Sequence, residues 1–387
     1  MGTSNEAVSM SGDEPISLMI SFQDLPDPRV EGRCDHKLID IIVITVCAVI
    51  AGAESWVDVE SFGEAKQEWL RTFLDVPHGV PSHDTFGRFF AALDAEAFQT
   101  AFMRWVEGVF RVSRGQVIAI DGKTVRRSHD RTIGQDAIHM VNAWATHNGI
   151  ALGQWQTDAK SNEITAIPPL LRQLNVAGCI VTIDAMGAQT KIAQAIRDEK
   201  ADYVLRVKDN QGHLHQDLQD WFAHADNVQF ADMQHSYAET VNKGHGRIEI
   251  RRCWAISDPL AFEYIRNYEG WTDLQTIVRV QRERRLPDKT EINTAYYISS
   301  LPAEADSLLD ATRFHWAVEN SLHWVLDVIF REDDARVRVG HAAHNMAILR
   351  QLALNIIKKD QSKGSIRTKR FKAGLDVTFL ENLLDQI

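Results

Sequence analysis

Three acidic residues occupy positions from which carboxylates could hold metal ions. Asp121 and Asp184 each end a short apolar, β-rich run, and Glu319 lies within a long helical pattern. An acid at the C-terminal end of a strand faces the crevice in which α/β sheets bind ligands. Carboxylate oxygens suit Mg²⁺ or Mn²⁺, and two such ions about 4 Å apart can activate a water or hydroxyl at a phosphodiester. The three acids therefore point to metal-dependent phosphoryl chemistry.

Each acid also has a simpler interpretation. Asp121 followed by glycine is a common hairpin-turn pair, and Asp184 could merely cap the next helix. On a straight helix Glu319 lies at the edge of an apolar face, on a polar ridge with His315 and His323. Asp327 continues that ridge and falls nearly opposite the apolar face, so we expect it to be solvated.

The elements that must position these acids fall into two groups. The pattern of residues 30–113 predicts short helices, with Asp35, Ser55 and Ser82 as their expected N-caps. Around residues 82–93 the pattern resembles a helix-turn-helix motif. This region has seven basic and thirteen acidic residues, which does not support DNA reading. A packing or protein–protein role is the open alternative.

From Gly115 onward strands and helices alternate. The order is a β hairpin through Asn148-Gly149, then β, α, β, α, β, which predicts a mixed sheet with antiparallel leading strands. Strand-like runs between about 211 and 301 predict a β-rich insertion. Helix resumes at 306–330 and at 341–359.

Composition bounds the function classes. The 387 residues carry a net charge of −11, so contacts to a polyanion must come from local patches, such as residues 358–372 with seven basic residues and one acid. The longest nearly apolar run, residues 41–53, is shorter than the roughly 20 residues of a membrane span. No signal peptide is recognisable, and four scattered cysteines without a CxxC pair argue against a disulfide framework or structural zinc. We expect a cytoplasmic protein.

Several motifs together resemble one family. HWAVENSLHWVLDVIFREDDARVR at 315–338 resembles the glutamate segment of DDE-type insertion-sequence transposases, in particular the H-repeat-associated, ISAs-type group. VIAIDGKTVRRS at 117–128, IVTIDAMGAQ at 180–189, YVLRVKDNQ at 203–211 and GHGRIEIRR at 244–252 are similar to the same group. The resemblance covers about residues 25–358.

The resemblance implies an α/β fold: an RNase H-like mixed-sheet catalytic domain with a β-rich insertion, preceded by an all-α N-terminal domain. The implied boundaries are a disordered leader 1–24, a helical domain 25–114, a catalytic domain 115–358 with the insertion at about 211–301, and a basic tail 359–387. It implies a transposase that cuts element ends and joins them to target DNA. Asp121, Asp184 and Glu319 would be catalytic and would hold two Mg²⁺ or Mn²⁺ ions. The wider class has a tyrosine–arginine–glutamate–lysine signature, but here Thr312, His315 and Leu326 stand at the other three offsets.

Further residues are candidates for assisting roles. His315, His323 and Asn320 flank the glutamate, and the two histidines are expected to orient it or touch the scissile phosphate. Trp316 and Trp324 could stack on an unpaired base, although structural tryptophans are commoner. Candidate contacts to DNA are Lys123, Arg126, Arg127, Lys208 with the following Asn210 and Gln211, Arg247, Arg284, Arg285, Lys369 and Arg370.

The expected partners are DNA, as terminal inverted repeats and target, and a second copy of the chain; no membrane is expected. Three alternatives stay open at this point: a nuclease without strand transfer, a catalytically silent DNA-binding relic, and a small-molecule phosphohydrolase.

Overall fold

The computed structural model describes residues 18–30, 32, 34–110, 112–129, 136–157, 163–244 and 246–385. Residues 1–17, most of the expected disordered leader, lie outside this range. The remainder of that segment contains helix α1 (Leu18–Phe22). Leu18 and Phe22 are buried, and the Phe22 ring packs 5.4 Å from that of Phe98. The helical part of the chain therefore begins before residue 25, because these two apolar side chains share one helix face.

The N-terminal region is all helical, as expected. Its helices are α2 (Leu38–Ala51), α3 (Trp56–Ala65), α4 (Gln67–Leu70), α5 (His83–Ala92) and α6 (Ala95–Val109). Ser55 forms the predicted capping box, and the Ser82 hydroxyl accepts from the backbone of Thr85. The N-cap of α2 is Lys37 rather than the expected Asp35.

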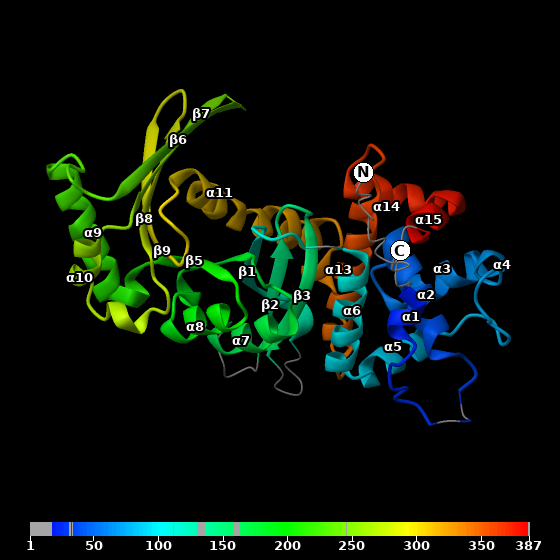
Figure 1. The fold of residues 1–387 in the computed structure, drawn as a ribbon. Coiled ribbons are helices and arrows are strands. Elements are labelled where there is room, and N and C mark those ends of the chain that lie inside the picture. The colour runs from blue at the N-terminus through cyan, green and yellow to red at the C-terminus, as the bar shows by residue number, and fades with distance from the viewer. Residues whose placement is uncertain are drawn as a thin grey trace, which may run out of the picture.

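The C-terminal segment folds onto these helices. It contains α13 (Ala342–Lys359), α14 (Ile366–Leu375) and α15 (Val377–Leu384), of which α13 and α14 pack against α2. In Figure 1 the red C-terminal helices lie beside the blue N-terminal ones. Residues 359–385 are thus part of the helical region, because apolar residues such as Phe379, Leu380 and Leu383 are buried there.

The centre of the molecule is a mixed sheet whose leading strands follow the prediction. Strands β1 (Val117–Thr124), β2 (His139–Ala145) and β3 (Ile150–Thr157) are antiparallel, and Gly149 has a φ of 67° in the β2–β3 turn. Strands β4 (Ile180–Ile183) and β5 (Asp202–Val207) continue the sheet in parallel with β1. Helices α7 (Glu163–Gln173) and α8 (Thr190–Asp198) pack together, α7 on β2 and β3 and α8 on β5.

The insertion extends this sheet and contains more than the expected strands. It begins with helix α9 (Gly212–Asn227), which the sequence did not predict, and β6 (His235–Gly244) was also missed. The other elements are β7 (Arg247–Ile256), α10 (Pro259–Tyr264), β8 (Thr276–Arg285) and β9 (Thr290–Ser299). Because β9 pairs with β5, one nine-stranded sheet results, in the order β3-β2-β1-β4-β5-β9-β8-β7-β6 (Figure 1). This pairing covers the β5 edge, which would otherwise expose unpaired backbone groups.

The expected continuous helix at 306–330 is interrupted. Helix α11 (Ala305–His315) is followed by a π-helical turn at Glu319–His323 and then by α12 (Trp324–Val328). A π turn holds more residues than an α turn, so every later side chain is rotated from its place on a regular wheel. Such turns are frequent at functional sites.

Among the described residues, no single helix has the length and apolar composition needed to cross a membrane. One bent pair, α2 with α3, passes those two criteria together, with an angle of 96° between its helices.

Candidate active site and nucleic-acid interface

Asp121 and Asp184 lie side by side at one edge of the parallel part of the sheet. The parallel pairing of β1 with β4 ends at Ile120 and Ile183, so each aspartate follows the last paired residue of its strand. Strand β1 itself continues to Thr124, because its antiparallel pairing with β2 goes on. The prediction that β1 ends at Asp121 was therefore wrong, and the hairpin-turn interpretation is excluded.

Asp184 has a capping role as well. Its side chain accepts a hydrogen bond from the backbone of Met186, 3.0 Å away, in a short 3₁₀ turn that follows β4. Asn210 and Gln211 stabilise the same loop, since their side-chain amides donate to the carbonyls of Ala185 and Ala188. The sequence analysis expected these two amides to contact DNA. In the structure they stabilise the loop that carries Asp184.

The charges of Asp184 and Glu319 both affect the pKa of Asp121. Burial, followed by the negative charge of Asp184, raises the pKa of Asp121 from 3.8 to about 7. The carboxylate of Glu319, the exposed first residue of the π turn, adds to this rise. Clustered oxygen donors without a compensating cation are the environment that a divalent ion relieves. The three acids thus fit a metal pair in donor chemistry.

The acids do not form a closed set of ligands. Within the part of the chain that the structure describes, no three His, Cys, Asp or Glu side chains are grouped closely enough to hold a metal ion. The expectation that the three carboxylates converge to share a metal pair is not met in this arrangement. Glu319, at the start of the π turn, is exposed to solvent.

A fourth acid near Asp121 was missed by the sequence reasoning. The Glu163 carboxylate lies against the Cα of Gly122, so closely that a β-carbon at this position would collide with its oxygens. It bonds His139 at 2.7 Å, and its charge raises the pKa of Asp121 more than that of Glu319 does. A glycine next to the first aspartate was the available signal, since it permits this close approach.

The two histidines lie beside the aspartates rather than beside the glutamate. His323 Nδ1 is 3.5 Å from Asp121 Oδ2, and His315 Nδ1 is 3.2 Å from the hydroxyl of Thr182, two residues before Asp184. Burial lowers the pKa of each ring to about 4. Both rings are therefore neutral near pH 7, so His323 contacts Asp121 and His315 contacts Thr182 without adding charge.

Asn320 has a structural contact at the helix interruption. Its side-chain amide donates to the carbonyl of Trp316 at 3.2 Å, across the start of the π turn. Trp316 and Trp324 are 48% and 54% exposed. Both rings are therefore accessible from solvent near Glu319.

Three basic side chains that were expected to contact DNA are buried in the protein instead. Lys123 is 8% exposed, and its ammonium contacts Asp327 and Glu332. Lys369 is 7% exposed and pairs with Asp360 at 2.8 Å. Arg370 is 6% exposed and donates to backbone carbonyls of α2 and of the segment after α12. These predictions were wrong, because each side chain finds protein acceptors inside the fold.

The contact of Lys123 also corrects the prediction for Asp327. That carboxylate is not turned to solvent but lies 2.5 Å from the Lys123 ammonium. The π turn explains the error, since it rotates Asp327 away from its position on a straight helix.

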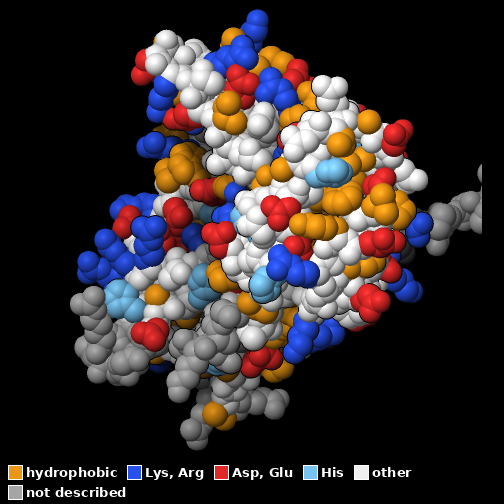
Figure 2. All heavy atoms as spheres, turned by 90° about the vertical axis from the view of Figure 1, so that its left-hand side faces the viewer, with side chains coloured by type: hydrophobic (Ala, Val, Ile, Leu, Met, Phe, Trp, Pro, Cys, Tyr) orange, Lys and Arg blue, Asp and Glu red, His pale blue; other side chains and the backbone are white. Residues whose placement is uncertain are grey.

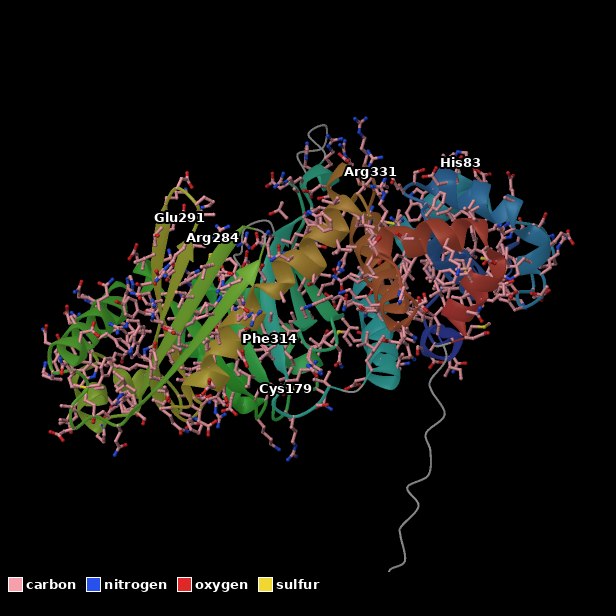
Figure 3. All side chains as sticks on the ribbon, turned by 90° about the horizontal axis from the view of Figure 1, so that it is seen from above. His83, Cys179, Arg284, Glu291, Phe314 and Arg331 are labelled. Carbon is pink, nitrogen blue, oxygen red and sulfur yellow. The ribbon has the colours of Figure 1, made fainter. Side chains whose placement is uncertain are left out.

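Other predicted cations remain at the surface. Arg126 pairs with Asp333, and Arg127 with Asp334, while Lys208 is exposed just after β5. Arg284 and Arg285 lie near the end of the β8–β9 hairpin, where Arg284 faces Glu291 at 3.9 Å (Figure 3).

A basic groove runs between the insertion and the helix that carries Glu319. Its volume is about 290 Å³. It is lined by arginines from four elements: Arg206, Arg247, Arg251, Arg282 and Arg313. Glu249 is the single acid among the described lining residues, and it pairs with Arg251 and Arg282 at 2.7 Å each. Most of the positive charge is left for a ligand.

The groove reaches the neighbourhood of Glu319. Trp316 and Asn320 line it, and the Arg206 guanidinium lies 5.8 Å from the Trp316 ring centre. Viewed from the insertion end, Lys and Arg side chains gather near the top and the left edge of the surface (Figure 2). Arg247 was predicted; alternation along β7 would also have placed Arg251 on its face.

Comparison with known proteins supports one family. Residues 112–356 match the family model described as "Transposase DDE domain", and residues 19–106 match one described as "DDE_Tnp_1-associated". The chain is 40% identical over 371 residues to "Putative transposase YncI" of Escherichia coli O157:H7, covering 95% of this chain and 94% of the relative. The chain belongs to the DDE transposase family. It is also 37% identical over 375 residues to "H repeat-associated putative transposase YhhI" of Escherichia coli strain K12, covering 95% and 97%.

Among solved structures, the piggyBac transposase synaptic complex with hairpin DNA, determined by cryo-EM, matches with a TM-score of 0.41 and 11% identity. The match covers 92% of this chain and 75% of that one.

As a DDE transposase, the chain departs from the wider signature around its glutamate in a way that the structure explains. Thr312 is 5% exposed and donates to the carbonyl of Leu309, and Leu326 is 2% exposed in the core. The Leu326 side chain is therefore unavailable to a ligand, whereas Thr312, although nearly buried, lines the basic groove. Basic side chains near Glu319 come instead from the groove.

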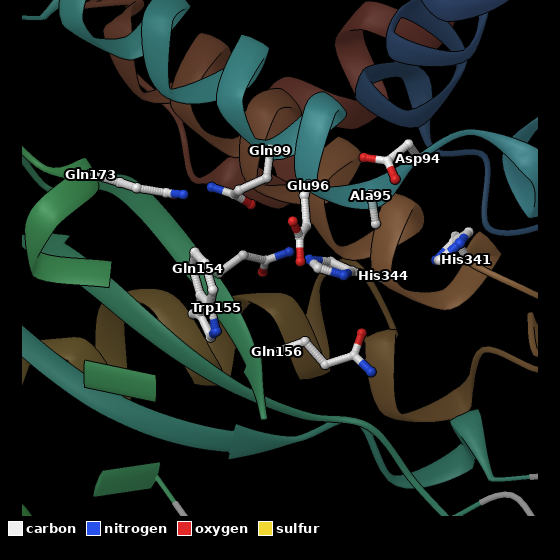
Figure 4. Close-up of a pocket in the computed structure, with 10 residues that line it drawn as sticks. All are labelled: Asp94, Ala95, Glu96, Gln99, Gln154, Trp155, Gln156, Gln173, His341 and His344. Atoms are coloured by element: carbon white, nitrogen blue, oxygen red, sulfur yellow. The ribbon is translucent and has the colours of Figure 1, made fainter. Parts of the chain in front are cut away.

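This DDE transposase also has a polar cavity of about 250 Å³ where α6 and α13 meet β3 (Figure 4). Gln154 lines this cavity, and its side-chain oxygen accepts a hydrogen bond from the side-chain amide of Gln351. The same Gln351 amide also donates to the side-chain oxygen of Asn142, which is the cross-strand partner of Asp121. The Asn142 amide lies 3.5 Å from His323. A buried chain of amides thus runs from the cavity to the ring beside Asp121 and fixes its surroundings.

Proposed function

We propose that this chain cuts the ends of an insertion element and joins them to target DNA by phosphodiester hydrolysis and transesterification. Asp121, Asp184 and Glu319 would hold two Mg²⁺ or Mn²⁺ ions. The observation that carries the proposal is that Asp121 and Asp184 lie side by side at one sheet edge, where the charges of Asp184 and of Glu319 both raise the pKa of Asp121. Membership of the DDE transposase family supports it.

The bound ions would activate a water or a 3′-hydroxyl and stabilise charge at the scissile phosphate. The protein's own groups bind and orient. Neutral His323 holds the Asp121 carboxylate from one side, and His315 holds Thr182 on the strand that ends at Asp184. Hydrogen-bond donors that are already fixed in place stabilise a transition state more than mobile donors do, because they need no reorganisation as charge develops.

The arginine groove supports DNA as the substrate. Its excess of guanidinium groups suits a phosphodiester backbone, since arginine donates two parallel hydrogen bonds to phosphate. Because the groove continues to Asn320, a strand bound in it would pass next to Glu319. We propose that a homodimer, associated with the nucleoid, binds the element ends in this way.

The test uses labelled duplexes that carry the inverted repeats flanking the coding sequence, with Mg²⁺ and an unlabelled target plasmid. Asp121→Asn, Asp184→Asn and Glu319→Gln should each reduce cleavage and joining below detection. Each variant should still bind the duplex, because the amides keep the shape and remove the charge. Asp310→Asn, which changes an exposed acid on α11, is the matched control and should keep full activity.

The outcomes separate the alternatives. Cleavage without joined product would identify a nuclease that lacks strand transfer. Duplex binding without cleavage by the unaltered protein would indicate a silent relic. Wild-type cleavage by any of the three variants would contradict the assignment of the metal-binding acids.

A further inference from the structure

Lys123 connects the strand of the first aspartate to the helix of the glutamate. It lies two residues after Asp121 on β1, so the two side chains leave the same face of the strand. Its ammonium is 2.5 Å from Asp327 Oδ1 and also contacts the Glu332 carboxylate. Asp327 belongs to α12, which continues directly from the π turn that begins at Glu319. One buried ammonium thus bridges β1, which carries Asp121, and α12, which directly follows the turn that carries Glu319.

The charges around this contact are balanced by a second cation. Arg350 of α13 lies with Nη1 3.6 Å from Glu332 Oε1. The side chains of Glu332 and Arg350 are 2% and 4% exposed, and that of Asp327 is 31% exposed. Two cations and two anions from β1, α12, α13 and the turn after α12 therefore form one largely buried network.

Stability alone is a poor explanation for such a network. Removing charges from water is costly, and replacing a buried ion group by packed neutral residues is often neutral or stabilising. What an ammonium between two carboxylates does provide is a single preferred alignment of the segments that carry them. Here that alignment is between β1 and α12.

That alignment bears directly on the metal site. Ligands must be held to within about 0.5 Å of their productive positions, and the acids of this site do not converge by themselves in the described part of the chain. The groups that orient metal ligands typically change metal affinity or activity by about 10- to 100-fold when they are altered.

We propose that Lys123, Asp327, Glu332 and Arg350 form a positioning network that sets the distance between Asp121 and Glu319, and thereby the metal affinity of the site. This inference rests on the proposed function. It assigns these four residues no contact with DNA or with the reacting atoms. Their effect passes through the acids that they align.

The test removes all four charges together, by Lys123→Met, Asp327→Asn, Glu332→Gln and Arg350→Met in one protein. This variant keeps the side-chain volumes and leaves no buried charge unpaired, so we expect thermal unfolding close to that of the unaltered protein. Mn²⁺ affinity, measured by titration calorimetry, should fall about tenfold and cleavage about a hundredfold. Binding of the element-end duplex should not change.

Asp327→Asn alone is the second variant, because this side chain is partly exposed and its loss is the mildest change. It should weaken Mn²⁺ binding severalfold. Asp334→Asn, which breaks an exposed ion pair with Arg127 in the same turn, is the control and should leave Mn²⁺ affinity unchanged.

The proposal is overturned if the fourfold variant binds Mn²⁺ and cleaves like the unaltered protein. If that variant does not fold, unchanged Mn²⁺ affinity in Asp327→Asn overturns the proposal. A different result would reject the proposed function instead: Mn²⁺ binding that is absent in the unaltered protein, or that survives Asp121→Asn at full strength.

Discussion

Two basic regions of this chain differ in how far their side chains are available to a ligand. Residues 358–372 are the densest cluster of cations in the sequence, yet Lys369 and Arg370 are buried and satisfied by protein acceptors. The groove arginines come from β5, β7, β8 and α11, are up to 107 residues apart in the sequence, and line a groove that is open to a ligand. Lys363, Arg367 and Lys372 of the segment 358–372 remain exposed, so charge density along the chain did not by itself predict which cations are available to a ligand.

The difference lies in what surrounds each guanidinium. Arg370 stacks on Phe330, with its Cζ 4.2 Å from the ring centre, and donates to two backbone carbonyls, those of Ile329 and Val49. In the groove, Arg251 and Arg282 pair with the one acid among the described lining residues, Glu249, and the five arginines line an open cavity. The first arrangement stabilises the fold, and the second attracts an anion.

The largest effect that follows from this comparison is on stability. Arg370→Met should lower the free energy of unfolding by about 3 kcal/mol, since two buried carbonyls lose a charged donor. Urea unfolding would measure it. Arg367→Met, an exposed change in the same helix, should stay within about 0.5 kcal/mol. An equal loss in both variants would remove the distinction between buried and exposed cations of this segment.

The next effect is on DNA binding. Arg247→Gln with Arg313→Gln, which leaves the pairs of Glu249 intact, should make the slope of log affinity against log salt shallower by about 2, at roughly 0.9 per lost phosphate contact. Arg172→Gln on α7, which is exposed and outside the groove, is the control. A slope that changes equally in Arg172→Gln would show that the groove has no special role.

The smallest effect concerns the uncompensated acids. Asp121 binds its proton more tightly in the folded protein than in the unfolded chain, with a pKa of about 7 against 3.8. Its stabilising contribution is therefore complete below about pH 4 and is lost as the pH rises through about 7. Without metal, thermal unfolding should show a decline on the order of 1 kcal/mol over this range, after allowing for solvent screening of the partly exposed carboxyl.

Asp121→Asn should flatten this decline, and Mn²⁺ should reverse it by replacing the proton. A metal-free protein whose stability is independent of pH between 4 and 7 would contradict the clustering of the acids.

Local features were determined by the sequence. The capping box at Ser55, the cap at Ser82 and the hairpin through Gly149 formed as predicted, because each depends on atoms only a few residues apart. Asp184 follows its short apolar strand as predicted, whereas β1 continues past Asp121; the order of motifs led to the correct family. The mixed α/β class with its helical N-terminal region was predictable for the same reason.

Tertiary structure decided which charges are used internally and which remain exposed. The burial of Lys123 depends on α12, the phase of α12 depends on one π turn, and the groove depends on the pairing of β9 with β5. These contacts join residues that are distant in sequence, so no local pattern contains them. A lysine or arginine side chain carries the same charge at either kind of position. Whether it is buried with protein acceptors or left exposed to DNA depends on the groups that surround it once the chain has folded.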